Sequence, residues 1–276
     1  SDASYTTFLN LAARYPYFCA EKGTWPSIQE ACTREIATVF AHAAQETGQI
    51  PPPSGVQPWQ SSLYYVREQT CYPDKCVKYD AGKEAFKAPA GAHFYGRGMK
   101  QVTYVYNYAG VSGALFGDGN VLVKNPDLVA ANAELVLGSG LWFYMSPQPP
   151  KPSMHATVVG TYRPTAAAAG ISPDADGSVK DKSSATVSII NGGIECGSIS
   201  GEPLIKSQAR YTNFVGLLKQ LNATLTPIEK SYHPGSTYCT ITQGNPFAAN
   251  LAALSYRPNF YYDTTAAGCK AIPWQT

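Results

Sequence analysis

One helix can be read directly from this sequence, because its start, its buried face and its end are all marked. Ser27 and Glu30 form a capping-box pattern, and apolar side chains recur at helical spacing from Ile36 onward. Gly48 and then three consecutive prolines terminate the pattern. We therefore predict a helix from about Ser27 to Glu46 with one buried face.

Two further helices are predicted, over residues 125–145 and 203–221, from a proline at the first helical position and from apolar spacing. The chain is irregular from the prolines to about residue 95, and again over residues 165–185. Loops this long in a compact domain are usually functional or disordered, and two cysteines in the first of them favour a functional loop. Period-two strand patterns are few and short, so the expected fold class is mainly α, a single domain with long loops.

The composition favours a neutral polar ligand. Charged residues make up only 14% of the 276 residues, the formal net charge is +2, and there are 19 tyrosines. A tyrosine-rich neutral surface suits an uncharged polar ligand such as a sugar, whereas a nucleic-acid binder normally carries a basic excess. No run of 18 apolar residues is present, so we expect no membrane span.

The cysteine spacing indicates two local disulfides, 19–32 and 71–76. The three cysteines that remain, of which one is an odd thiol, are Cys196, Cys239 and Cys269. There is no CxxC pair and there are only four histidines, so we predict no metal site and no cofactor. Spaced cysteines with low charge favour a secreted protein over a reduced cytosolic one.

Two glutamates stand out as candidates for acid–base chemistry. Glu46 lies at the end of an otherwise apolar helix, and Glu68 lies in a hydrophobic stretch of the long loop. A carboxylic acid near apolar walls keeps its proton at higher pH and can donate it, while a second carboxylate in a wetter place can activate water. Inverting glycoside hydrolysis requires such a pair with room for water between its members.

Five ordered blocks of sequence carry a family resemblance. Residues 95–108 read YGRGMKQVTYVYNY and resemble the signature YGRGPxQLTxxxNY of glycoside hydrolase family 19, the plant-type endochitinases. The family blocks NPDLV, LWFWM, QPPKPS and IINGGxECG resemble residues 125–129, 141–145, 148–153 and 189–197. The resemblance implies a catalytic domain over residues 1–222, followed by an extension, 223–276, packed on the same domain.

The resemblance also implies roles for individual residues. Glu46 matches the general acid, Glu68 the general base, and Thr103 the residue that holds the attacking water. Glu195 and Arg210 match a buried pair that tunes the proton affinity of the acid. The positions that match substrate contacts are Gln101, Tyr106, Asn107 and Asn191, together with Phe86, where many plant members carry a sugar-stacking tryptophan.

The implied protein is a lysozyme-like, two-lobed helical domain with long loops around a substrate cleft. Its implied activity is endo-hydrolysis, with inversion, of β-1,4 linkages in chitin or chitooligosaccharides, by a secreted monomer without cofactors. The two carboxyl groups should then lie roughly 6.5–9.5 Å apart. Two alternatives stay open: a lysozyme-like peptidoglycan hydrolase, and an inactive chitin-binding defence protein or decoy, which the family departures at Gln45 and Gln49-Ile50 keep in play.

Overall fold

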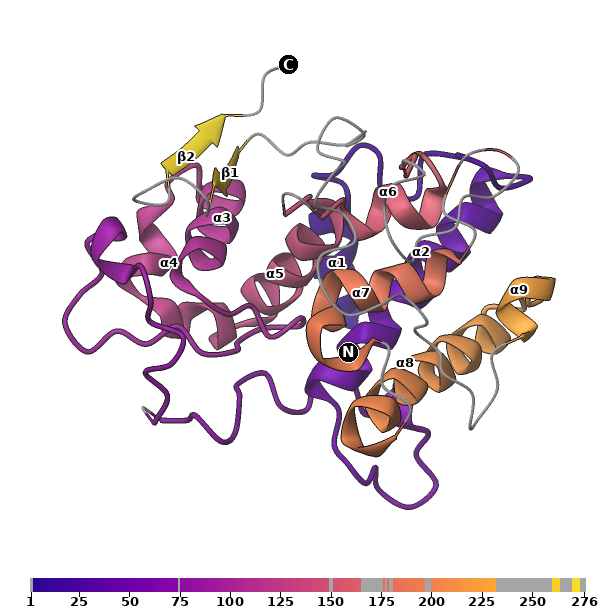
Figure 1. Ribbon diagram of the computed structural model, residues 1–276, viewed down its shortest axis with the longest axis horizontal. Coiled ribbons are helices and arrows are strands. Elements are labelled where there is room, and N and C mark those ends of the chain that lie inside the picture. The colour runs from indigo at the N-terminus through magenta and orange to yellow at the C-terminus, as the bar shows by residue number, and fades with distance from the viewer. Residues whose placement is uncertain are drawn as a thin grey trace.

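The helices predicted from the sequence are present in the computed structural model, which describes residues 2–73, 75–148, 151–164, 176, 178, 181–196, 200–231, 260–263 and 270–273. The α-helices are α1 (Asp2–Ala12), α2 (Ile28–Thr47), α3 (Val105–Phe116), α4 (Asn120–Lys124), α5 (Ala133–Met145), α6 (Met154–Val159), α7 (Lys182–Glu195), α8 (Gly201–Gln220) and α9 (Pro227–Lys230). Short 3₁₀ helices cover Pro58–Ser61, Lys83–Phe86 and Pro126–Ala130. In Figure 1, α3 and α4 lie at one end of the molecule and α8 and α9 at the other.

Helix α2 begins and ends where its sequence signals indicated. The Ser27 hydroxyl accepts a hydrogen bond from the Glu30 backbone N–H at 3.1 Å, which satisfies one of the free donors of the first turn. At the other end, the Gly48 N–H donates to the Ala44 carbonyl at 2.9 Å. Glu46 is thereby placed in the last turn of a rigid element.

Helices α2 and α8 lie side by side (Figure 1). Ala37 and Ala41 of α2 are buried against Phe214 and Leu218 of α8, and the small alanine side chains let the two backbones approach closely. This packing brings the middle of α8 next to the C-terminal end of α2, where the candidate acid lies.

The second predicted helix is divided in two. Pro126–Ala130 forms a 3₁₀ helix, and Asn132, in an extended conformation, then caps α5 by accepting a hydrogen bond from the Leu135 N–H at 3.0 Å. Helix α5 ends at Met145, as predicted. The third predicted helix, over residues 203–221, corresponds to α8.

Helix α3 was not predicted, although it carries two of the candidate site residues. Its side chains are buried almost all round, so it lacks the polar face that makes a helix visible in sequence. Gly110 allows the closest contact, because a Cβ there would lie only 2.5 Å from the Trp142 ring of α5. A glycine at this place lowers helix propensity but permits the packing.

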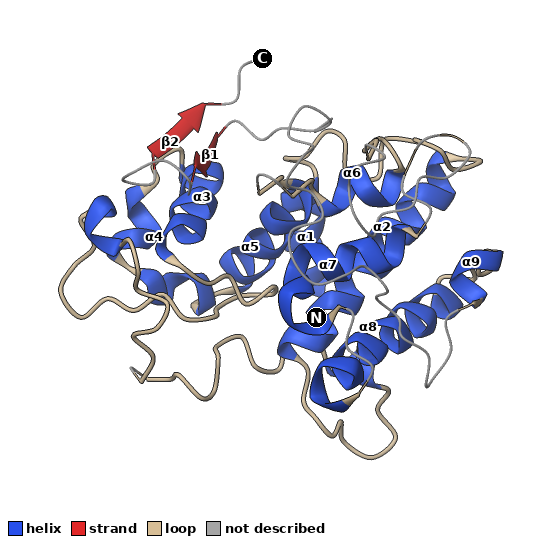
Figure 2. Cartoon of the chain, viewed as in Figure 1, coloured by secondary structure: helices blue, strands red, loops and turns tan. Residues whose placement is uncertain are grey.

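The long loop after α2 is confirmed, and Figure 2 draws it in tan beneath the helices. The second predicted loop, residues 165–185, lies mostly outside the described residues. Its last part is helical instead, since α7 begins at Lys182 with the Asp181 carboxylate accepting a hydrogen bond from the Ser184 N–H.

Both predicted local disulfides are confirmed, Cys19–Cys32 and Cys71–Cys76. Cys196 is also disulfide-bonded. The positions of Cys239 and Cys269 lie outside the described residues.

The first part of the C-terminal extension packs on the helical body. Glu229 of α9 pairs with the buried Arg34 of α2, with Nε and Oε1 3.0 Å apart, and its carbonyl accepts a hydrogen bond from the Tyr211 hydroxyl. Farther along, β1 (Phe260–Asp263) and β2 (Lys270–Pro273) pair antiparallel, and β1 lies against α3 (Figure 1). Within the described residues, no helix combines the length and the apolar character that crossing a membrane requires.

A buried histidine on α6 lies between two carboxylates. His155 Nδ1 is 2.6 Å from Glu35 Oε1, and Nε2 is 2.8 Å from Glu21 Oε2. Glu35 is fully buried and also accepts the Cys19 N–H. Burial alone would lower the pKa of His155, but the hydrogen bonds to Glu21 and Glu35 outweigh it and raise the pKa to about 9.

This cluster predicts a loss of stability at alkaline pH. The pKa of His155 is higher in the folded protein than its unfolded value of about 6.5. The protonated histidine therefore contributes fully to the free energy of unfolding below pH 6.5, and this contribution is lost as the pH rises towards 9. The free energy of unfolding should fall by about 3 kcal/mol over this window. Thermal unfolding from pH 6 to 9.5 measures it, and in His155→Gln the decline should flatten. Parallel curves for the two proteins would assign the decline to other groups.

Candidate active site

A cleft of about 570 Å³ runs between the end of α2, the long loop, the start of α3 and helices α7 and α8. Of the residues singled out from the sequence, those that line it are Glu46, Glu68, Gln101, Thr103, Tyr106, Asn107, Asn191, Glu195 and Arg210. Charged and polar side chains predominate in the lining of this cleft, as expected of a site for a hydrophilic ligand.

Glu46 belongs to a hydrogen-bonded array of charges. Its Oε1 accepts a hydrogen bond from Arg210 Nη2, while its side chain stays 20% exposed to the cleft. Arg210 also holds the fully buried Glu195 through Nε and Nη2, both at 2.7 Å, and Asn191 Nδ2 donates to the same carboxylate at 2.8 Å. Burial would lower the pKa of Arg210, but the two facing carboxylates raise it instead. The predicted acid and its predicted charge partners are therefore in direct contact.

His42 completes this array and was not anticipated. Its Nδ1 lies 3.1 Å from Arg210 Nη1, and its Nε2 lies 2.8 Å from the Thr186 hydroxyl, which itself donates to the Ser183 carbonyl. Nε2 must therefore donate and Nδ1 accept. Burial, followed by the charges of Lys100 and Arg210, holds the pKa of His42 well below its usual value, which agrees with a neutral ring. The sequence signal was its position one turn before Glu46 on the same helix face.

Glu68 is held by a short antiparallel pairing with the signature block. Its backbone N–H donates to the Gly96 carbonyl at 2.8 Å, and the Gly98 N–H donates to the Val66 carbonyl at 2.9 Å. The Gly96 N–H also donates to Oε2 of the Glu68 side chain, at 3.1 Å. A Cβ at position 96 would lie 2.8 Å from Gln101 Oε1 and 3.3 Å from that carboxylate oxygen, so glycine keeps room for both side chains.

Arg97 anchors the signature block in the interior. It is 1% exposed, and its guanidinium donates to Asp127 Oδ1, to the His93 carbonyl and to the Tyr108 hydroxyl at 2.8–2.9 Å. Arg97 and Tyr108 belong to the first resemblance block and Asp127 to the second, so these two blocks are linked in space. Arg97 thereby anchors to the protein interior the turn that pairs with the Glu68 segment.

The next turn presents the residue proposed to hold water. Gln101 and Tyr104 both have positive φ, 50° and 69°, which is uncommon for residues with side chains and is concentrated at functional sites. Thr103 lies between them and donates its hydroxyl to the Gln101 carbonyl at 2.7 Å, which leaves its oxygen to accept. Asn107 Nδ2 donates to the Thr103 carbonyl at 2.8 Å and braces this turn.

On the opposite wall, Asn191 lies at a kink in α7, where its φ of −147° departs from helical values. The Lys151 ammonium donates to the Ser188 and Ile189 carbonyls, at 3.4 and 2.9 Å, next to this kink. The kink and the lysine together turn Asn191 towards Glu195 at the cleft.

Lys100, inside the signature block, is a second residue that the sequence argument overlooked. It is 2% exposed, and its ammonium donates to the Val39 carbonyl of α2 at 2.6 Å. Burial and the nearby charge of Arg210 lower its pKa well below the usual value, while Glu46 acts in the opposite sense. The floor of the cleft next to Glu46 thus contains an amine as well as a guanidinium.

Phe86 is the exception among the predicted contacts. It does not line the cleft but packs, half-buried, against the hydrophobic core at the end of the 3₁₀ helix Lys83–Phe86. The aromatic side chains at the cleft on this side are Tyr79, Tyr104 and Tyr106. Of these three, Tyr79 comes from the same long loop as Phe86.

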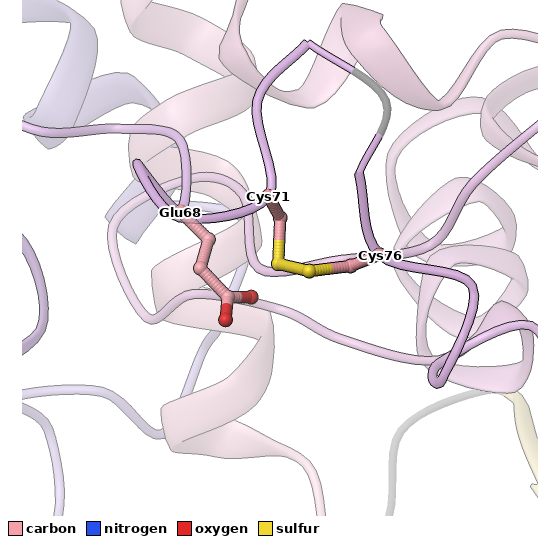
Figure 3. Close-up of side chains that lie close together, drawn as sticks. All are labelled: Glu68, Cys71 and Cys76. Carbon is pink, nitrogen blue, oxygen red and sulfur yellow. A yellow bond between two sulfur atoms is a disulfide. The ribbon is translucent and has the colours of Figure 1, made fainter.

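Glu68 also lies beside a disulfide (Figure 3). A carboxylate oxygen of Glu68 and the sulfurs of Cys71 and Cys76 are within 4.8 Å of one another, a spacing that would suit a metal ion. The two sulfurs are bonded to each other, however, and so do not offer thiolate ligands. The disulfide instead closes the loop that follows Glu68.

Comparisons with known proteins agree with this fold and cleft. The model of glycoside hydrolase family 19, described as chitinase class I, matches residues 2–223. Chitinase 3 of Oryza sativa subsp. japonica is 33% identical over 217 residues, 78% of this chain and 62% of that protein. Endochitinase B of Nicotiana tabacum is 35% identical over 196 residues, 70% of this chain and 54% of that protein. The solved chitinase C from Streptomyces griseus HUT6037 matches with a TM-score of 0.57 and 25% identity, covering 81% of this chain and 71% of that chain.

The chain belongs to glycoside hydrolase family 19, the chitinase class I family. The mainly helical, lysozyme-like fold that the resemblance implied is confirmed by the structural match. The chain spans only 54–62% of the length of the two plant relatives named above.

Proposed function

We propose that this protein is an endochitinase that hydrolyses β-1,4 linkages between N-acetylglucosamine units with inversion at the anomeric carbon. The observation that carries the proposal is the meeting of Glu46, Glu68 and Thr103 at one cleft, with Glu46 paired to Arg210. The names of the plant and bacterial relatives support chitin or chitooligosaccharides as the substrate.

In the proposed mechanism Glu46 is the general acid. It donates its proton to the glycosidic oxygen, so that the leaving sugar departs as a neutral alcohol. Arg210 and Glu195 act as its charge partners and keep the carboxyl group in one orientation. The ionised acid left after proton transfer then has a guanidinium already in contact, which favours bond cleavage.

Glu68 is the proposed general base. It removes a proton from a water molecule whose other hydrogen is accepted by Thr103, and the resulting hydroxide attacks the anomeric carbon from the face opposite the leaving group. Gln101, Tyr106, Asn107 and Asn191 are proposed to bind the sugar units, because their polar atoms line the same cleft. No step calls for a cofactor.

We further propose that the protein is secreted and acts as a monomer. The two disulfides support the first point, since such bonds persist in oxidising compartments. The second point rests on the cleft, to which a single chain contributes both carboxylates.

The test is the anomeric composition of the products from a soluble N-acetylglucosamine hexamer, separated by chromatography within minutes of mixing. Fresh α-anomer is expected from single displacement on a β-linkage. Fresh β-anomer would mean a retaining mechanism and a wrong role for Glu68. Binding without product would favour the inactive chitin-binding alternative, and clearing of bacterial walls as readily as chitin would favour the lysozyme-like one.

A further inference from the structure

Tyr79 is attached to the carboxylate on the base side of the cleft. Its hydroxyl donates to Glu68 Oε1 at 3.1 Å, while the Gly96 N–H donates to Oε2 at 3.1 Å. Each oxygen of the carboxylate thus has a donor, which restricts the side chain to one orientation. Burial raises the pKa of the Tyr79 hydroxyl, so it remains a protonated donor near neutral pH.

The ring of Tyr79 belongs to an aromatic cluster on the same wall. Its edge meets the ring of Tyr104 at a centroid distance of 5.4 Å and an interplanar angle of 87°. Tyr104 in turn lies parallel to Tyr106, with centroids 5.6 Å apart and an angle of 7°. These three rings line the cleft next to Thr103. One side chain therefore contacts both the carboxylate and the tyrosine pair that faces the substrate space.

The segment that carries Tyr79 is anchored close to Glu68. The Cys71–Cys76 disulfide closes the chain between these two residues (Figure 3). The exposed Lys78 places its ammonium 4.6 Å from the centre of the Tyr79 ring. The disulfide in the preceding segment thus restrains the backbone near Tyr79, in addition to the contacts made by its ring and its hydroxyl.

We propose that Tyr79 is a positioning residue of the hydrolytic reaction, which aligns Glu68 through its hydroxyl and fixes the Tyr104–Tyr106 pair through its ring. The inference rests on the proposed function, because it assumes that Glu68 is the base. The hydroxyl orients the carboxylate towards the water through a directional, charge-assisted hydrogen bond. The ring keeps the sugar-facing tyrosines in place.

The two halves of this role can be separated by two substitutions. Tyr79→Phe removes only the hydroxyl, so kcat on the hexamer should fall roughly tenfold with KM within about twofold of wild type. Tyr79→Leu also removes the ring, so KM should rise in addition, by roughly three- to tenfold.

Tyr5→Phe is the matched control, since Tyr5 lies 66% exposed on α1 and away from the lining of the cleft. It should match wild type in kcat and in KM, and melting curves for every variant check that each one is folded. A Tyr79→Phe enzyme with wild-type kcat, or one in which KM rises while kcat does not fall, overturns the role of Tyr79 alone. A folded wild-type protein without activity on the hexamer overturns the proposed function, and the role of Tyr79 with it.

Discussion

Replacing Glu46 with glutamine is expected to abolish hydrolysis of the N-acetylglucosamine hexamer and to leave binding of that oligomer largely intact. The amide has nearly the shape of the carboxyl group but no proton to donate, and general acid catalysis contributes typically 10²- to 10⁴-fold to rate. Because the glutamine amide oxygen can still accept the hydrogen bond from Arg210, the replacement should not disturb the walls of the cleft. Turnover is measured by chromatography and binding by calorimetry.

The control for this substitution is Glu134→Gln, which makes the same chemical change at an exposed position on α5, in a surface ion pair with Arg14. Its turnover should equal that of wild type. A Glu46→Gln enzyme that keeps a tenth of wild-type turnover would remove Glu46 as the acid, whatever the control shows.

Replacing Arg210 with methionine is expected to be the most destabilising of the substitutions considered. It would leave the fully buried Glu195 carboxylate without its charge partner, and breaking a buried ion pair by removing one member costs about 3–5 kcal/mol. His42 would lose its donor to Nδ1 as well. Urea unfolding, analysed at constant slope, measures the change in the free energy of unfolding.

Two further variants test whether the loss of stability in Arg210→Met is caused by the buried charge that it leaves unpaired. Arg14→Met removes an arginine from an exposed pair and should cost less than about 1 kcal/mol. Adding Glu195→Gln to Arg210→Met should restore part of the lost stability, because the orphaned carboxylate becomes neutral. Equal losses in Arg210→Met and Arg14→Met would show that the array does not stabilise the fold.

Local signals in the sequence were enough to find part of this structure. Helix α2 was predicted almost to the residue, because Ser27 caps it, its apolar side chains follow one face and Gly48 ends it. Helix α3 was missed because it is buried on nearly every side, so no polar face alternates with an apolar one. Asn132, which starts α5, was overlooked because the proline upstream gave a stronger start signal.

The residues of the candidate site were also found where the sequence carries a local signal. Residues inside recognisable blocks, such as Glu195 and Asn191, were found by their order along the chain, and the structure places them at the cleft. Tyr79 was missed because its contact with Glu68 depends on the course of an irregular loop, and His42 was missed because its contact with Arg210 forms only when α2 and α8 pack together. Phe86 was proposed as a sugar contact from the family resemblance, and the structure packs it, partly buried, against the core cluster.

Thr47, the last residue of α2, joins the two catalytic walls. Its hydroxyl donates to the Ala43 carbonyl at 2.6 Å and accepts the Leu63 N–H at 2.8 Å, and its carbonyl accepts the Tyr65 N–H at 2.8 Å. Glu46, the proposed acid, directly precedes Thr47, and Glu68, the proposed base, follows Tyr65 along the loop. On the proposed mechanism, the separation of the two carboxyl groups, which must admit one water molecule, is therefore set at a helix terminus. Inversion at the anomeric carbon then depends on a threonine that does not itself take part in the reaction.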